Sequence, residues 1–156
     1  MTLLPASVRW RPGGCCAFSS LYFVAVKLVI FVLKHRGGVR NVSAAIDLVR
    51  TKVFSASNGD RARSLNIAII FVHGVVVDHA ATMRAASEAR RYGITILIVG
   101  VTDNVLRSQL DSIASYPMLS NVFSVQNYYS FINVQSGLLR AVCNGSYIVI
   151  LLLLAQ

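Results

Sequence analysis

The polar side chains of this chain show few of the combinations that perform chemistry. His73 and His79 straddle a turn, but we expect no third ligand nearby that would complete a transition-metal site. Ser43 and Ser64 lack histidine and acid partners at the spacing of a catalytic triad. The chain contains neither a GxGxxG nor a GxxxxGK phosphate-binding loop. We therefore predict that it is not an enzyme and uses no cofactor.

Composition and charge narrow the possible partners. Of the 156 residues, 55% are apolar and 13% charged, against typical values of about 45–50% and 25%. The net charge is +9, but the basic residues are scattered among apolar ones and form no basic helix face. We therefore expect no nucleic-acid partner. Three cysteines, Cys15, Cys16 and Cys143, include no CxxC pair, so no zinc site is expected and one thiol is left over.

The N-terminal part is an apolar leader. Cys15 to Leu33 is apolar apart from Lys27, and Arg9 and Arg11 precede it. One interpretation is a membrane anchor or an uncleaved signal, although a central lysine costs ~2.5–3.5 kcal/mol on insertion scales. The other interpretation is a buried or poorly folded apolar segment.

From Asn41 onward the hydrophobic pattern alternates between helices and buried strands. The length indicates one domain, and the alternation predicts an α/β fold, a doubly wound parallel sheet with helices on both faces. Tyr147 to Ala155 is apolar, too short for a bilayer span of ~20 residues, and of the right length for an aggregation-prone strand. The expected strands are Leu65–Val72, Ile94–Val101 and Asn121–Val125, and the expected helices are Asn41–Val53, Asp78–Tyr92, Val105–Ser115 and Tyr128–Val142.

Three blocks of the sequence carry a family resemblance. They are Gly37-Gly38-Val39-Arg40-Asn41-Val42-Ser43, Ile69-Ile70-Phe71-Val72-His73-Gly74 and Tyr92 to Val101. They resemble the second half of a von Willebrand factor type A domain, in particular the repeated A domains of type VI collagen chains. The resemblance implies a partial Rossmann-like sheet that lacks its first strands. It divides the chain into a leader (1–32), a partial A domain (33–143), which ends at Cys143 as these domains often do, and an apolar tail (144–156).

The same resemblance bears on metal binding. A domains of this family hold a divalent cation with a DxSxS motif, a Thr and an Asp. This chain has no DxSxS, and Arg40 and His73 stand at the positions of the Thr and the Asp. A hard cation requires a cluster of oxygen ligands, so we expect a degenerate site without metal. The alternative is that Arg40 and His73 hold an anion.

Two asparagines match the glycosylation pattern, Asn41-Val42-Ser43 and Asn144-Gly145-Ser146. Asn144 is our candidate for modification if the chain enters the secretory pathway. Asn41 lies in the loop that corresponds to the metal loop of the family, and we expect it to remain unmodified.

The resemblance implies a non-enzymatic protein-interaction module of the extracellular matrix, whose partners are matrix components or collagen chains. Its abrupt limits predict a truncated, aberrantly spliced or pseudogene-like product. The alternative is a small membrane-anchored protein that uses Cys15–Leu33 as its anchor. A nucleotide- or anion-binding enzyme is disfavoured by the missing phosphate loop.

The missing strands have a structural consequence. Without them, the Leu65–Val72 strand is expected to lose a neighbour and expose an apolar edge. Leu21–Leu33 and Tyr147–Ala155 are the two segments of the chain that are candidates to fill the gap.

Overall fold

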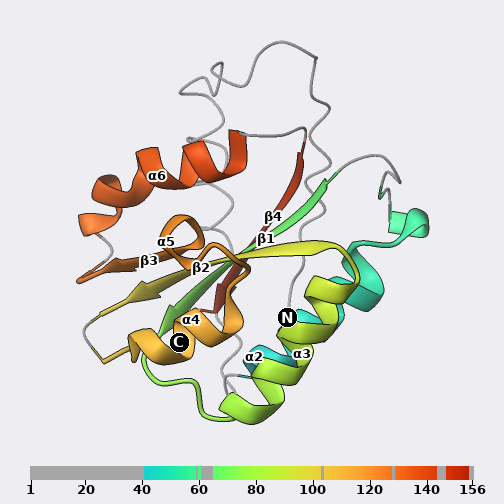
Figure 1. The fold of residues 1–156 in the computed structure, drawn as a ribbon, viewed down its shortest axis with the longest axis horizontal. Coiled ribbons are helices and arrows are strands. Elements are labelled where there is room, and N and C mark those ends of the chain that lie inside the picture. The colour runs from blue at the N-terminus through green and yellow to red at the C-terminus, as the bar shows by residue number, and fades with distance from the viewer. Residues whose placement is uncertain are drawn as a thin grey trace, which may run out of the picture.

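The computed structural model describes residues 41–58, 60, 65–102, 104–127 and 129–143, and the backbone of 147–154. These residues form a four-stranded parallel sheet in the order β3-β2-β1-β4, with helices on both of its faces (Figure 1). The predicted class, a partial doubly wound α/β fold, is confirmed. In chain order the elements are α2 (Val42–Leu48), the π-helix η1 (Val49–Val53), the 3-10 helix η2 (Ala56–Asn58), β1 (Leu65–His73), α3 (His79–Arg91), β2 (Ile94–Val101), α4 (Arg107–Ile113), α5 (Met118–Asn121), β3 (Val122–Val125), the 3-10 helix η3 (Tyr129–Phe131), α6 (Ile132–Cys143) and β4 (Tyr147–Leu154).

Local sequence explains how these elements begin and end. Strands β1 and β2 are almost uninterrupted apolar runs, and most of their side chains are buried, as expected for central strands of a parallel sheet. Helix α3 begins where the Asp78 carboxylate accepts a hydrogen bond from the Ala81 N–H at 3.0 Å. It ends before Gly93, whose φ of +86° is a conformation that favours glycine.

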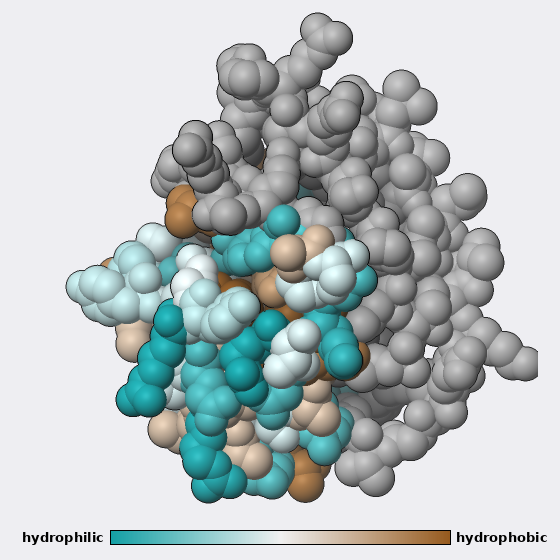
Figure 2. All heavy atoms as spheres, turned by 90° about the vertical axis from the view of Figure 1, so that its right-hand side faces the viewer, coloured by the Kyte–Doolittle hydropathy of each residue, from teal (hydrophilic) through white to brown (hydrophobic). Residues whose placement is uncertain are grey.

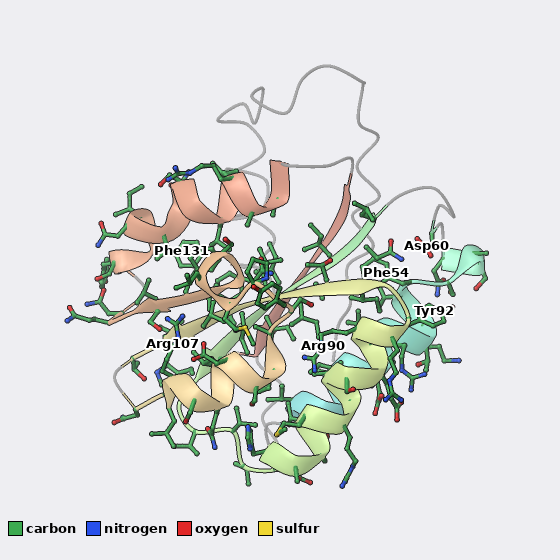
Figure 3. All side chains as sticks on the ribbon, viewed as in Figure 1. Phe54, Asp60, Arg90, Tyr92, Arg107 and Phe131 are labelled. Atoms are coloured by element: carbon green, nitrogen blue, oxygen red, sulfur yellow. The ribbon has the colours of Figure 1, made fainter. Side chains whose placement is uncertain are left out.

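Alternation along the strands divides the core into two layers. Helices α2, α3 and α4 cover one face of the sheet and α6 covers the other (Figure 1). Ala68, Ile70 and Val72 of β1 belong to the first layer. Ile67, Ile69 and Phe71, their neighbours along the strand, belong to the second. On the α6 side the ring of Phe131 lies 5.2 Å from that of Phe71 (Figure 3), so the short 3-10 turn before α6 is fixed to the sheet.

The outer edge of β1 is not left open. Strand β4 pairs with it in parallel register, from Leu65 opposite Tyr147 to Val72 opposite Leu154. The expectation of an exposed apolar edge at Leu65–Val72 is therefore wrong. The tail segment, one of the two candidates, provides the missing neighbour because its uncharged, apolar run from Tyr147 can continue a buried ladder. The other candidate, Leu21–Leu33, lies outside the described residues.

Several element boundaries differ from the expected ones. The helix expected over Tyr128–Val142 is divided into η3 and α6, and the helix expected from Asn41 changes to π-helical geometry at Val49. A short helix, α5, precedes β3 and was not expected, because it contains a single turn. Such short or irregular turns leave no periodic pattern in the sequence.

Candidate functional site

The loops that follow β1, β2 and β3 meet at one edge of the sheet. Because the strands are parallel, all of their carboxyl ends lie on this side (Figure 1). We call this region the carboxyl edge and define it as residues 73–79, 102, 104–107 and 129–132. In open parallel sheets, the carboxyl ends of the strands are where ligands usually bind.

Of the sequence-predicted site residues, the structure describes His73. It is the last residue of β1, is half-buried, and lies beside Val101 of β2 in the strand register. Arg40 and Asn144 lie outside the described residues. Whether Arg40 and His73 come together therefore remains a prediction, as does the anion site that they would form.

Five exposed apolar side chains belong to the carboxyl edge. Two of them follow β1, one follows β2 and two follow β3: Val75 (49% exposed), Val77 (72%), Leu106 (55%), Tyr129 (93%) and Ile132 (69%). Sequence reasoning missed this surface. The signal available was Val75-Val76-Val77, a run of β-branched residues directly after Gly74 at a place where a turn would ordinarily be polar.

The loop after β1 is held in place by its middle residue. Val76 is 3% exposed, and its N–H donates to Oε1 of Gln109 in α4 at 3.3 Å. With Val76 turned into the core, its neighbours Val75 and Val77 are left exposed on either side. The two apolar side chains therefore stand on a loop that is anchored to the scaffold.

A hydrogen bond between His79 and Ser112 joins α3 to α4 in the same region. Nε2 of His79 and Oγ of Ser112 are 2.8 Å apart. The Ser112 hydroxyl donates to the carbonyl of Gln109 at 2.8 Å, so His79 is the donor in the pair. In a catalytic pair the histidine would accept the hydroxyl proton, so this contact has the polarity of a structural tie.

The side of the molecule on which α3, η1 and η2 lie differs from the carboxyl edge. Figure 2 shows mostly hydrophilic side chains over the described part of this face. Lys52 of η1 and Arg84, Glu88 and Arg91 of α3 are exposed. Arg50 is paired with Asp47 at 3.2 Å and with Glu88 at 3.1 Å. Solvated and partly neutralised charges of this kind are typical of an ordinary surface, so the carboxyl edge remains the candidate site.

Thr102 occupies an unusual backbone conformation at the carboxyl edge. It directly follows β2, and its φ of 84° makes it the one non-glycine residue with positive φ in the described part of the chain. Its N–H donates to the carbonyl of Val125 at 2.8 Å, which ties the ends of β2 and β3 together. Its hydroxyl is buried without a hydrogen-bond partner among the described residues. A β-branched residue is strained in this conformation.

We expect Thr102→Gly to raise the free energy of unfolding by about 1 kcal/mol. The change removes left-handed strain of ~1–3 kcal/mol and a buried unpaired hydroxyl, while the flexibility of glycine costs ~0.5–1 kcal/mol. Urea denaturation followed by circular dichroism measures the difference. Thr95→Gly, in the extended part of the same strand, is the matched control and should destabilise. Equal losses for the two variants would contradict the assignment of strain to Thr102.

The described residues do not fit the divalent cation of A-type domains. No group of three histidine, cysteine or acidic side chains stands close enough to hold a metal ion among the residues that the structure describes. The resemblance places His73 where the family has an aspartate, and the carboxylate of Asp78 caps α3. A hard cation needs several oxygen ligands, and this donor set does not provide them.

We expect isothermal titration of the purified chain with magnesium or manganese to give no saturable heat. The reason is that the resemblance puts the imidazole of His73 in the place of an oxygen ligand, and that no group of three histidine, cysteine or acidic side chains stands together among the residues that the structure describes. Binding tighter than millimolar that disappears in Asp78→Ala or Asp103→Ala would reveal a substitute site.

The fold is that of an open α/β domain with a parallel sheet, in which loops follow the carboxyl ends of the strands. The model of the von Willebrand factor type A domain matches residues 25–136, so the chain belongs to that family. The predicted family is thereby confirmed. The match begins within the apolar leader and ends within α6.

Curated relatives are extracellular matrix proteins. Vitrin from Bos taurus is 30% identical over 127 residues, which are 76% of this chain and 19% of that protein. Vitrin from Mus musculus is 31% identical over 113 residues, 72% of this chain and 17% of that protein. The collagen alpha-6(VI) chain from Homo sapiens is 34% identical over 98 residues, 62% of this chain and 4% of that protein. The chain thus spans less than a fifth of the length of these relatives.

A solved structure supports the fold. Proximal thread matrix protein 1 from the mussel byssus, with a zinc-occupied MIDAS motif, aligns with a TM-score of 0.68 over 77% of this chain and 30% of that protein. The sequence identity is 20%, so the comparison speaks for the fold alone. In the part of the chain that the structure describes, no helix has the length and apolarity needed to cross a membrane; the leader Cys15–Leu33 lies outside that part.

Proposed function

We propose that the chain is a protein-interaction module of the extracellular matrix that binds its partner without a metal ion. The observation that carries the proposal is that five apolar side chains of the carboxyl edge are exposed: Val75, Val77, Leu106, Tyr129 and Ile132. The relationship to vitrin and to collagen VI chains supports the extracellular setting and the absence of catalysis.

The physical argument is that this edge supplies apolar contact area on an ordered scaffold. Val76 anchors one loop through Gln109, and His79 ties α3 to α4 beside it. Binding energy at protein interfaces is concentrated in a few buried apolar and aromatic side chains, and an ordered loop loses little conformational entropy on binding. An apolar contact of this kind does not require a bridging cation. Matrix proteins, including collagen chains, are the proposed partners.

The test is binding of the secreted full-length chain to immobilised type VI collagen, measured by surface plasmon resonance. We expect saturable binding that is the same in magnesium and in EDTA. Replacing both Val77 and Leu106 by Asp should raise Kd at least ~10-fold, because losing 1.4 kcal/mol of binding energy weakens binding tenfold.

A matched control uses two apolar residues at the other end of the sheet. Tyr116 and Leu119 are 85% and 93% exposed and lie before β3. Their joint replacement by Asp should leave Kd unchanged. Absence of saturable binding, its loss in EDTA, or an equal effect of the control pair would each overturn the proposal.

A further inference from the structure

The sequon Asn41-Val42-Ser43 is placed where its acceptor atom is accessible. Asn41 is exposed and directly precedes α2. Its Oδ1 accepts hydrogen bonds from the N–H of Ala44 and from the hydroxyl of Ser43, each at 2.8 Å. No hydrogen bond from its Nδ2 is found among the described residues. We propose that Asn41 is a site of N-linked glycosylation.

The oxygen Oδ1 and the nitrogen Nδ2 of the Asn41 side chain have different roles. Oδ1 holds the start of α2, and Nδ2 is the atom that carries a glycan in the Asn-X-Ser pattern. The donor is an oligosaccharide attached to a lipid pyrophosphate. A bond forms between Nδ2 and the sugar C1, and the C1–O bond to the pyrophosphate breaks. The lipid pyrophosphate leaves with the electron pair, and Nδ2 loses one proton.

The product is compatible with the fold. The glycosylated amide retains its carbonyl oxygen, so both hydrogen bonds to Oδ1 persist after modification. An N-cap hydrogen bond is worth ~1 kcal/mol, and the modification leaves that contribution in place. The proposal differs from the expectation from the sequence that Asn41 stays unmodified because it lies in the loop that corresponds to the metal loop of the family. Membership of that loop does not bury the side chain.

The inference rests on the proposed extracellular role, because this modification takes place in the secretory pathway. The experiment therefore places the full chain behind a cleavable signal peptide in mammalian cells, so that entry into the pathway no longer depends on residues 1–32. Medium and cell lysate are both treated with peptide-N-glycosidase, and the readouts are gel mobility and conversion of Asn41 to aspartate in the peptide mass spectrum. If Asn41 is not modified under these conditions, the glycosylation proposal fails, and the outcome of the collagen-binding test is not affected.

The variants separate modification from folding. Asn41→Asp keeps an N-cap acceptor but removes Nδ2, and we expect it to abolish the mobility shift when Asn144 is also replaced by Asp. Ser43→Ala should also abolish the shift, whereas Ser43→Thr should preserve it. Asn144→Asp is the matched control and should retain the shift at Asn41. An unshifted wild-type chain, or a shift that is lost in Asn144→Asp but kept in Asn41→Asp, would overturn the inference.

Discussion

Removal of residues 147–156, which include β4, is expected to abolish cooperative folding. Strand β1 pairs with β4 along eight positions, from Leu65 to Val72. Roughly half of these residues direct their backbone groups towards β4, and a buried unpaired group costs ~1–3 kcal/mol. The apolar side chains beside this edge would also become exposed to solvent. A domain of this size is stable by only ~5–15 kcal/mol, so the loss would consume most of that margin.

Thermal unfolding followed by circular dichroism, together with sedimentation velocity, measures the result. The truncated chain should show no sharp transition, and it should associate because its strand edge is open. Removal of Ala155 and Gln156 alone, which leaves β4 complete, is the matched control and should have little effect. If the larger truncation melted cooperatively as a monomer, the ladder between β1 and β4 would not contribute to stability.

Arg90→Leu should lower the free energy of unfolding by ~2–3 kcal/mol. Arg90 belongs to the last turn of α3, and its side chain reaches the end of α4 (Figure 3). Its Nη1 donates to the carbonyls of Ile113 at 2.6 Å, Ala114 at 3.2 Å and Ser112 at 3.5 Å. The last carbonyls of a helix have no partner within the helix, and hydrogen bonds from a charged donor contribute ~1.5–3 kcal/mol. Burial lowers the pKa of Arg90, and this desolvation is offset by the three carbonyl oxygens.

The measurement is urea denaturation, with the midpoint and slope compared between variants. Arg91→Leu, at the exposed neighbouring position, is the control and should change stability by no more than ~0.5 kcal/mol. Arg90→Lys should give an intermediate loss, because an ammonium group keeps the charge but lacks the planar fork of a guanidinium. Equal stability of the Arg90→Leu and Arg91→Leu proteins would show that the carbonyls of α4 find other partners.

The sequence was sufficient to predict the strands and the longer helices. The runs Leu65–Val72 and Ile94–Val101 are continuous apolar segments of strand length, and both are central strands in the structure. The position of the tail was harder to predict, because an apolar run of strand length is compatible with several sheet orders. The pairing of Tyr147 with Leu65 depends on a contact between residues far apart in the chain.

Details of the site depended on packing that the sequence does not display. At Gly100, a Cβ atom would lie 2.7 Å from Cδ1 of Leu110, so a larger residue there would have to displace the Leu110 side chain of α4. The positive φ of Thr102 could not be predicted from the sequence either, because a threonine ordinarily indicates an extended backbone. Exposure of Val75 and Val77 follows from the anchoring of Val76 to α4, a contact between distant segments.

The pairing of β1 with β4 also determines how long β1 must wait for its partner strand during synthesis. The two strands face each other with Leu65 opposite Tyr147, a separation of 82 positions (147 − 65). At a translation rate of ~5–20 residues per second, β4 follows β1 out of the ribosome by roughly 4–16 s. During that interval one side of β1 has no β4 to pair with, and contacts so distant in sequence also form slowly. Nascent chains on the same messenger RNA would then present matching strand edges to one another, so yield in cells should depend on chaperones that shield β1 during synthesis.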